Sequence, residues 1–280
     1  MNQLGMETAL AAVSSLQTDA ARVESELKQL LGSDRGSPGE AVRTAMQHAV
    51  LGRGRRIRPT LALRVARLGN ADSDLVLRAA AAVELLHCAS LIVDDLPCMD
   101  NESERRGQPT CHAKFGEPTA LLAAFGLVAM AARCVVEQRC TPTEMSNLIR
   151  FQVELLKMLD CSCLIAGQDM DLKLTGAGRE AQRDQMTDLK TVPLFVLSAQ
   201  AGLLFEDPNS LLARQVRRFA RDFGRAFQTV DDYLDSELAS PQPALQQIEI
   251  ARLSLRPLQP AARELEELVE YLHARCHGKS

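Results

Sequence analysis

Two clusters of aspartates lie far apart in this sequence, and both are typical of a site that holds metal ions. The first reads Asp94-Asp95-Leu-Pro-Cys-Met-Asp100, and the second reads Asp231-Asp232-Tyr-Leu-Asp235. Carboxylates this close repel one another unless a cation lies between them. Hard oxygen ligands favour Mg²⁺, which binds through a few carboxylates together with the phosphate groups of a substrate. The two clusters therefore predict a site where Mg²⁺ holds a diphosphate.

Each cluster also has a plainer explanation as an acidic patch on the surface of a helix. Asp94 and Asp95 follow an apolar helix, where acidic side chains oppose the dipole of a helix C-terminus. Asp231 and Asp235 are an i, i+4 pair, and like charges at that spacing destabilise an isolated helix. Gln228 lies one turn before them on the same face. The second pattern is weak by itself, but its pairing with the first favours the metal site.

Basic and polar side chains suited to phosphate binding accompany these clusters. Arg105 and Arg106 closely follow the first cluster, and guanidinium groups bind phosphate through paired hydrogen bonds. Lys190 and Thr191 lie in an otherwise apolar helix, where a lysine either binds an anion or extends its amine to solvent. His87 lies two turns before the first cluster on the same helix face, and a buried core histidine is its alternative explanation.

A further basic group precedes Pro59, and it consists of Arg55, Arg56 and Arg58. A solvated turn explains these arginines as well as a phosphate site does, so the local sequence leaves both explanations open.

The composition favours a helical globular protein. The chain has 280 residues, of which 46% are hydrophobic and only 4% aromatic, and Ala and Leu dominate. The net charge is −4, without an extended basic stretch, so we expect no nucleic-acid partner. The eight cysteines do not follow a zinc or disulfide spacing, which favours reduced thiols in the cytoplasm.

Helical periodicity runs along nearly the whole chain, and it predicts a single all-α domain over residues 1–280 with roughly ten helices. The predicted helices lie near residues 7–31, 40–51, 59–68, 74–96, 119–138, 142–173, 180–204, 208–235 and 260–276. The helix at 74–96 is apolar almost all round, which indicates a central buried position. Residues 101–118 contain Gly and Pro and are predicted to form a loop, and no hairpin signal is present.

The sequence shows no pattern typical of a signal peptide or of a membrane-spanning helix. The N-terminus lacks the basic and apolar regions of a signal peptide. The longest apolar run, residues 120–132, is too short to span a bilayer. We therefore expect no integral membrane segment.

In order and spacing, these motifs resemble the trans-isoprenyl diphosphate synthases, the short-chain polyprenyl synthases that make geranyl, farnesyl and geranylgeranyl diphosphate. The resemblance covers about residues 40–235. It rests on Gly52–Pro59, Glu84–His87, the first aspartate cluster with the segment to Thr110, Gly167-Gln168, Lys190-Thr191 and Phe227–Asp235. It implies an isoprenoid synthase-like helical bundle around a central cavity, and a homodimer.

The resemblance also implies a role for each site residue. About three Mg²⁺ ions around an allylic diphosphate would be held by Asp94, Asp95, Asp100, Asp231, Asp232 and Asp235. Arg105 and Lys190 would bind the same diphosphate. Isopentenyl diphosphate would be bound by Arg55, Arg58, His87 and Arg106. Thr191 and Gln228 would face the developing allylic cation. In the implied reaction, the allylic C–O bond ionises and the double bond of isopentenyl diphosphate attacks the cation.

The residues just before the first cluster would form the floor of the tunnel that holds the growing chain. Here they are Ala89 and Ser90, both small, where relatives with shorter products often carry an aromatic residue. With the two extra residues in the first cluster, this favours a C20 product, geranylgeranyl diphosphate. Leu85 or Leu86, about one turn deeper, is the alternative floor, and farnesyl diphosphate synthase is the alternative activity.

The chain departs from the family pattern in three places. Val93 replaces a usual histidine, and Ala-Phe-Gly126 replaces a usual Gly-Asp pair. A Gly-Lys segment normally follows the second cluster, whereas residues 236–251 contain no basic residue. Arg252 or a partner would have to supply the missing phosphate contact.

Two rival functions follow from the same pattern. A non-catalytic subunit that modifies another synthase usually has an eroded second cluster, whereas this chain keeps all six aspartates. A class I terpene cyclase usually carries a different second motif and an aromatic-lined pocket, which this sequence does not show. We therefore favour an enzyme that joins isopentenyl diphosphate to an allylic diphosphate.

Overall fold

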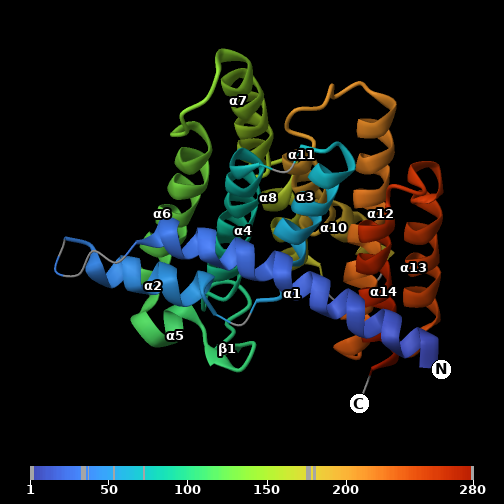
Figure 1. Ribbon diagram of the computed structural model, residues 1–280. Coiled ribbons are helices and arrows are strands. Elements are labelled where there is room, and N and C mark those ends of the chain that lie inside the picture. Colours follow the sequence, from blue (N-terminus) through green and yellow to red (C-terminus); the bar gives the residue numbers. More distant parts are fainter. Residues whose placement is uncertain are drawn as a thin grey trace.

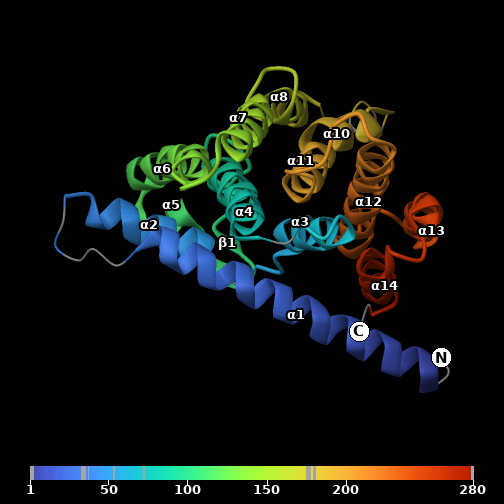
Figure 2. The same ribbon diagram turned by 45° about the horizontal axis from the view of Figure 1, so that its top comes forward.

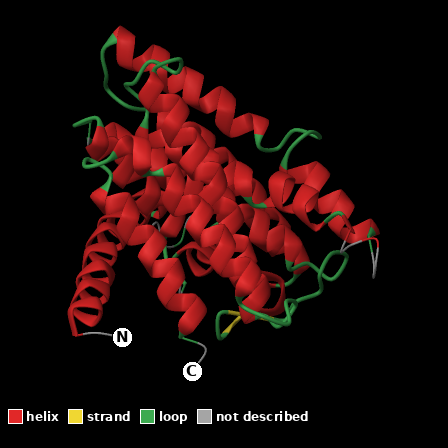
Figure 3. Cartoon of the chain, turned by 90° about the vertical axis from the view of Figure 1, so that its right-hand side faces the viewer, coloured by secondary structure: helices red, strands yellow, loops and turns green. Residues whose placement is uncertain are grey.

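The computed structural model describes residues 3–32, 36, 38–52, 54–71, 73–174, 178 and 181–278, with the backbone alone for residues 3–14. Within these residues the chain is helical almost throughout, and its strands form one small hairpin (Figures 1 and 3). This confirms the predicted all-α fold class.

The helices and strands follow one another along the chain. The first half contains α1 (Gln3–Leu31), α2 (Glu40–Val50), α3 (Ile57–Leu68), α4 (Asp74–Asp94), β1 (Glu104–Arg105), β2 (Gln108–Pro109), α5 (Cys111–Phe115) and α6 (Glu117–Val136). The second half contains α7 (Pro142–Lys157), α8 (Leu164–Lys173), α10 (Arg183–Lys190), α11 (Val192–Gly202), α12 (Leu211–Leu234), α13 (Gln242–Ser254), the 3₁₀ turn η1 (Arg256–Leu258) and α14 (Arg263–His277).

Two predicted helices are each interrupted in the structure. The prediction for residues 142–173 is wrong across residues 158–163, where consecutive turns separate α7 from α8. Asp160 and Ser162 favour such turns, because their side chains compete for backbone hydrogen bonds. The prediction for residues 180–204 is wrong at Thr191, which separates α10 from α11. Pro193 follows in the first turn of α11, where its missing N–H group is tolerated.

The segment predicted as a loop, residues 101–118, contains regular structure. Strands β1 and β2 pair antiparallel, and α5 follows them. The turn between the strands is formed by Arg106 and Gly107, which have φ angles of 56° and 74°. Two consecutive left-handed residues match the twist of a tight hairpin. Helix α13 is a further element that the predicted set does not contain.

Helix α4 is the central helix of the molecule and is buried on nearly all sides, as the sequence predicts (Figures 1 and 2). It begins after Ser73, whose hydroxyl accepts a hydrogen bond from the amide of Val76. It packs against α3, α6 and α11 and ends at Asp94. Pro97 lies just beyond this end, where it cannot disrupt the helix. This arrangement presents the first aspartate cluster at the end of a rigid core element.

The apolar core consists of two clusters joined by α3 and α11. One cluster surrounds α4 and α6, and the other surrounds α12, α13 and α14. Helix α11 contributes Leu197 to the first cluster and Phe195 to the second. Helix α3 likewise contributes Leu63 to the first cluster and Leu61 to the second. These two helices therefore fix the distance between the helices that carry the two aspartate clusters.

The first and last helices, α1 and α14, both contact Arg64 on α3. Arg64 is fully buried and donates from Nε to Asp19 on α1 at 2.9 Å. Its guanidinium also lies 3.1 Å from Glu267 on α14. Figure 2 shows α1 crossing one side of the molecule past α3 and α14. The paired charges satisfy an arginine that would otherwise be costly to bury.

Two described helices, α4 and α6, are long and apolar enough to cross a membrane by length and composition. The core helices of globular proteins meet the same criterion. Most of the apolar part of α4 is buried within the protein, whereas α6 leaves more of its surface exposed.

Candidate active site

The two aspartate clusters border one polar cavity of about 570 Å³. Asp94 and Asp100 line it from the first cluster, and Asp231 and Asp235 line it from the second. The other predicted site residues that line it are Arg55, Arg58, His87, Ser90, Arg105, Arg106, Lys190, Thr191 and Gln228. Segments far apart in the sequence thus converge on one cavity.

Asp94 carries the most strongly perturbed carboxylate of the first cluster. It is 9% exposed, and burial raises the pKa of Asp94 to about 6. The nearest cation is Lys190, whose Nζ lies 3.8 Å from a carboxylate oxygen of Asp94. The same amine donates to Asp171 on α8 at 2.8 Å. The structure thus pairs Lys190 with Asp171, and binding of a substrate anion by this lysine stays a prediction.

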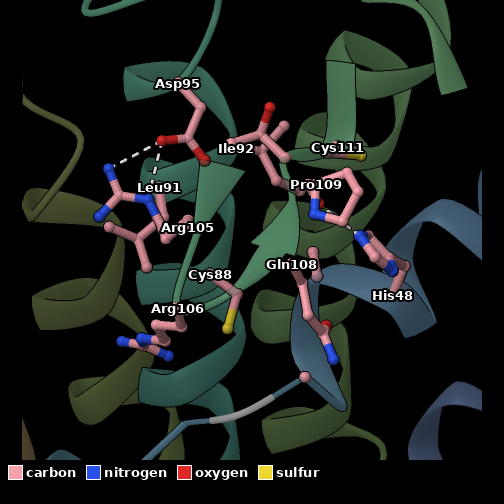
Figure 4. Close-up of a pocket in the computed structure, with 13 residues that line it drawn as sticks. His48, Cys88, Leu91, Ile92, Asp95, Arg105, Arg106, Gln108, Pro109 and Cys111 are labelled. Carbon is pink, nitrogen blue, oxygen red and sulfur yellow. Dashed lines mark hydrogen bonds and ion pairs between the residues drawn. The ribbon is translucent and has the colours of Figure 1, made fainter. Parts of the chain in front are cut away.

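Asp95 faces away from the main cavity and binds Arg105. Its carboxylate accepts from Nε of Arg105 at 2.8 Å and lies 2.7 Å from Nη2 (Figure 4). Burial raises the pKa of Asp95, and the guanidinium opposes this shift. A small cavity of about 60 Å³ lies beside this pair, between α4 and the hairpin. Asp95 therefore fixes the direction of an arginine that borders the main cavity.

Asp231 is paired with Arg275, a residue of α14 that the sequence did not single out. Nη2 of Arg275 lies 2.8 Å from Asp231. The guanidinium stands 5.5 Å from the ring centre of Phe227 and is largely buried. Burial raises the pKa of Asp231, and Arg275 opposes this shift. Arg275 adds a positive charge to the wall of the main cavity.

Asp232 is not among the described residues that line the main cavity. It is 7% exposed, and one of its oxygens accepts from Nε2 of Gln228 at 2.7 Å. The hydroxyl of Thr191 donates to the other end of this amide at 2.7 Å. Burial raises the pKa of Asp232, and the hydrogen bond from Gln228 opposes this shift. The structure thus joins Thr191, Gln228 and Asp232 in one hydrogen-bonded chain.

The opposite side of the cavity is basic. Nη1 of Arg58 lies 3.2 Å from Nε2 of His87, and its guanidinium stands 4.6 Å from the ring centre of Phe195. Burial lowers the pKa of Arg58 to about 10, so the guanidinium remains charged at pH 7. Burial and the neighbouring arginines lower the pKa of His87 well below its usual value. The imidazole is therefore neutral, and this side presents arginine charge to an anion.

Arg56 differs from its neighbours in the basic group before Pro59. It is 2% exposed and binds Glu84 on α4 at 2.8 Å. Its φ angle of 53° turns the chain at the start of α3. This turn directs the Arg56 guanidinium toward Glu84, and the pair anchors to α4 the segment whose Arg55, Arg56 and Arg58 all border the cavity.

An apolar cavity of about 520 Å³ adjoins the polar one. The two share Ser90, Asp94 and Lys190 in their walls. Ala89 and Leu86 line the apolar cavity from α4, whereas Leu85 is fully buried in the core and is not among its lining residues. Helices α6 and α8 supply most of the remaining wall. A tail attached to a diphosphate at Asp94 would enter this space directly.

The acids of the polar cavity have the chemistry expected of magnesium ligands. The four acids that the two clusters contribute are aspartates, and several lie partly out of water with their charge only partly offset by arginine or lysine. Glu84, the fifth acid in the wall, is paired with Arg56. Within the described residues, no three acidic, histidine or cysteine side chains converge closely enough to hold an ion by themselves. Mg²⁺ in proteins commonly takes one or two carboxylates together with substrate phosphates.

The basic residue missing from 236–251 is not replaced by Arg252. That side chain binds Glu270 on α14 and is not among the described residues that line the main cavity. The segment between α12 and α13 covers only residues 235–241. Cations near the second cluster come instead from other helices, namely Arg275 on α14 and Arg183 on α10.

Comparison with known proteins agrees with this geometry. Residues 39–242 match the family model described as polyprenyl synthetase. The chain belongs to the polyprenyl synthetase family. A geranylgeranyl diphosphate synthase of Pantoea ananas is 36% identical over 268 residues, which are 92% of this chain and 87% of that protein. This confirms the resemblance to trans-isoprenyl diphosphate synthases.

Plant relatives match a shorter region. Geranylgeranyl pyrophosphate synthase 4 of Arabidopsis thaliana is 38% identical over 207 residues, which are 72% of this chain and 54% of that protein. The chain spans about half the length of such relatives. Among solved structures, a geranyltransferase from Legionella pneumophila has a TM-score of 0.85 and 31% identity, and covers 95% of this chain and 98% of its own. The apo structure of a FPP/GFPP synthase from Zymomonas mobilis has the same TM-score with 28% identity, covering 94% and 99%.

Proposed function

We propose that this protein is a prenyltransferase that joins isopentenyl diphosphate to an allylic diphosphate. One observation carries the proposal: both aspartate clusters border a single polar cavity, and this cavity adjoins an apolar one. The polar cavity suits two diphosphate groups, and the apolar cavity suits a hydrocarbon tail. The names of the relatives support the same substrate class.

In the proposed reaction, the bond between the allylic carbon and its diphosphate oxygen breaks, and the diphosphate leaves with both electrons. The double bond of isopentenyl diphosphate then forms a carbon–carbon bond with the allylic cation. Loss of one proton from the adduct, to the departed diphosphate, restores a double bond. When bound, about three Mg²⁺ ions would supply positive charge that stabilises the leaving diphosphate. We assign their binding to Asp94, Asp100, Asp231 and Asp235.

The protein side chains have separate tasks in this proposal. Lys190 and Arg105 bind the allylic diphosphate, with Asp95 holding Arg105 in place. The basic side of the cavity binds isopentenyl diphosphate through Arg55, Arg58, Arg106 and the neutral His87. Thr191 and Gln228 present oxygen atoms near the developing cation. Walls that exclude water protect the cation from hydrolysis.

The apolar cavity supports a C20 product, geranylgeranyl diphosphate. Ala89 and Ser90 lie in its wall beside Asp94, and neither fills the space as an aromatic residue would. Leu86 also lines this cavity, so it is the deeper of the two candidate floors. Farnesyl diphosphate is the alternative product if the leucine limits chain growth.

We further propose that the chain acts as a homodimer in the cytoplasm. Large apolar side chains are exposed on α6 and α7, among them Phe125, Ile149 and Val153. A surface of this kind is typical of a protein interface. The eight free cysteines suit a reducing compartment.

The direct test is to incubate the purified chain with Mg²⁺, isopentenyl diphosphate and either geranyl or farnesyl diphosphate. Chromatography of the hydrolysed products should show a prenyl alcohol, with C20 as the main length. A single C15 product would replace the C20 assignment by a farnesyl diphosphate synthase. Complete lack of product would favour the non-catalytic subunit.

A further inference from the structure

The middle aspartate of the second cluster has surroundings unlike those of its neighbours. Asp231 and Asp235 line the main polar cavity, whereas Asp232 lines a separate polar cavity of about 350 Å³ between α10, α12 and α13. Asp232 is also the most buried of the three. Its carboxylate is thus placed behind the wall that the other two form.

Both oxygens of Asp232 are engaged by protein side chains. Oδ1 accepts a hydrogen bond from Nε2 of Gln228 at 2.7 Å. Oδ2 faces Arg183 on α10, whose Nη1 lies 3.6 Å away. A carboxylate held from two sides in this way has little freedom to turn toward the main cavity.

These contacts decide which way the amide of Gln228 faces. Only the nitrogen of this amide can donate to a carboxylate, so Asp232 selects the orientation in which Nε2 points toward Asp232 and away from the main cavity. The carbonyl oxygen then accepts from the hydroxyl of Thr191 at 2.7 Å, beside the main cavity. The opposite orientation would place the amide oxygen against the carboxylate of Asp232. Asp232 therefore presents the carbonyl of Gln228 to the place where a cation would develop.

Arg183 is the cation that stabilises Asp232 in this position. It lies seven residues before Lys190 and so on the same face of α10. Its other terminal nitrogen is 3.8 Å from Glu237, and Nη1 is buried without a hydrogen-bond partner among the residues described. The segment that follows the second cluster contributes no basic residue through residue 251. Arg183 is thus the positive charge placed against Asp232.

We propose that Arg183 and Asp232 are positioning residues that fix the amide of Gln228, and that Asp232 is an orienting carboxylate instead of a magnesium ligand. The contacts among these residues do not depend on the reaction. The effect on turnover rests on the proposed prenyltransferase function, because Gln228 then faces the allylic cation.

The kinetic test compares three substitutions. Arg183→Gln should lower kcat about tenfold, as loss of one oriented contact in the transition state does, with KM for both substrates within about twofold. Arg183→Lys should restore most of the rate, because it keeps the charge. Arg225→Gln is the matched control: Arg225 lines the same second cavity but binds Asp188 on the surface, and its loss should leave kcat unchanged. Equal rates for the Arg183→Gln and Arg225→Gln variants would overturn the proposal.

A double-substitution cycle tests whether Arg183 acts through Asp232. Asp232→Asn removes the charge that Arg183 opposes. Adding Arg183→Gln to Asp232→Asn should therefore cause little further loss of kcat. Fully additive losses would mean that Arg183 acts elsewhere, and this would contradict the proposed chain of contacts.

A binding measurement separates an orienting carboxylate from a metal ligand without use of the reaction. Inorganic pyrophosphate would be titrated by calorimetry into each variant in the presence of Mg²⁺. Asp231→Asn should weaken binding at least about tenfold, whereas Asp232→Asn should change it less than about threefold. Equal losses would make Asp232 a ligand and overturn the assignment. If the wild-type chain forms no prenyl product, the proposed function fails, but this comparison still decides the role of Asp232.

Discussion

Three acidic residues of the site, Asp94, Asp95 and Asp231, lie close to a base that offsets part of their charge. Asp95 is bound by Arg105 and Asp231 by Arg275. Asp94 has a weaker partner, because the amine of Lys190 lies 3.8 Å away and donates to Asp171. Asp94 therefore carries the largest uncompensated cost of burial among the aspartates of the first cluster.

Replacement of Asp94 by Asn should stabilise the protein in the absence of Mg²⁺. The pKa of Asp94 is about 6 in the folded state, against 3.8 for an ordinary aspartate. A raised folded-state pKa contributes stability below about pH 4, and this contribution is lost as pH rises through about 6. At pH 7.5 the Asp94→Asn variant should therefore gain about 1–3 kcal/mol in free energy of unfolding.

Urea denaturation with EDTA present measures this gain. The difference between wild type and variant should shrink as the pH is lowered to about 4, where the aspartate is protonated in both states. Asp100→Asn is the matched control, because Asp100 belongs to the same cluster but is exposed, and no gain is expected. A destabilised Asp94→Asn variant at pH 7.5 would contradict the expected cost of burying this charge.

A bulky side chain at position 89 should shorten the product. Ala89 lines the apolar cavity beside Asp94, so Ala89→Phe would place a ring across the path of the tail. The main product should fall from C20 to C15 or shorter, as measured by chromatography of the hydrolysed products. Leu211→Phe, at an exposed position on α12 outside this cavity, is the control and should leave the length unchanged. If Ala89→Phe left the product length unchanged, Leu86 would replace Ala89 as the residue that limits product length.

The sequence identified residues of the site by their type and by local spacing. The i, i+4 pair Asp231 and Asp235 and the small residues Ala89 and Ser90 could be found in this way. Arg275 could not, because an arginine near the end of an amphipathic helix has no local signal that separates a cavity residue from a solvated one. Its position depends on how α14 packs against α12. Only the tertiary structure supplies that information.

At the scale of elements, the position of Lys190 depends on close contact between α8 and α10. A Cβ atom on Gly167 would lie 2.8 Å from the backbone nitrogen of Lys190 and 3.0 Å from the carbonyl carbon of Leu189. These are backbone atoms, which cannot move without moving the helix. Gly167 thus permits the approach that brings Lys190 toward Asp94.

Gly167→Ala should reduce both stability and activity. The added methyl group would push α10 away from α8, which should cost about 1–3 kcal/mol and displace Lys190 and Thr191. Denaturation and steady-state kinetics on the same preparation measure both effects. Gly69→Ala is the control, because the nearest atom to its added Cβ, the carbonyl oxygen of Ala66, would be 3.8 Å away and its φ is negative. Full activity in Gly167→Ala would show that α10 tolerates the shift.

Element boundaries were predictable where a periodic apolar stripe ended at a clear signal. The end of α4 before Pro97 is one example. The break between α10 and α11 was missed, because residues on both sides of Thr191 are compatible with one continuous helix. The hairpin was missed for another reason: its strands have two residues each and show no alternation. Gly107 and Pro109 indicated a turn or loop here, but not a strand on either side.

At the scale of the whole molecule, apolar side chains are exposed along α7. Ile149, Val153 and Leu156 follow one another at spacings of four and three residues, so they form one stripe of the helix. Neighbouring α6 exposes Leu122 and Phe125. A stripe of this kind is costly in water unless another surface covers it.

Substitution of this stripe should disrupt the proposed homodimer. The double variant Ile149→Glu with Val153→Glu would place like charges in the interface, and light scattering should report a monomer. Leu211→Glu, at an exposed position on α12, is the control and should leave the mass unchanged. A wild-type chain that is itself monomeric would remove the basis for the dimer.

The overall architecture was the most predictable feature, because helical periodicity and one apolar helix suffice to indicate a buried centre. The division of the core into two clusters was not predictable, since α3 and α11 contribute side chains to both. No local pattern shows which neighbour each face of such a helix will meet. The cavity between the clusters follows from that division.

The junction of the two cavities at Ser90, Asp94 and Lys190 has a consequence for how length is controlled. In the proposed reaction, charge would fix the head of every intermediate at the same point, so the far end of the tail would advance by one five-carbon unit per cycle. The depth of the apolar cavity, and not the number of additions, would then set the final length. Primers of five, ten or fifteen carbons should all be extended to the same final size.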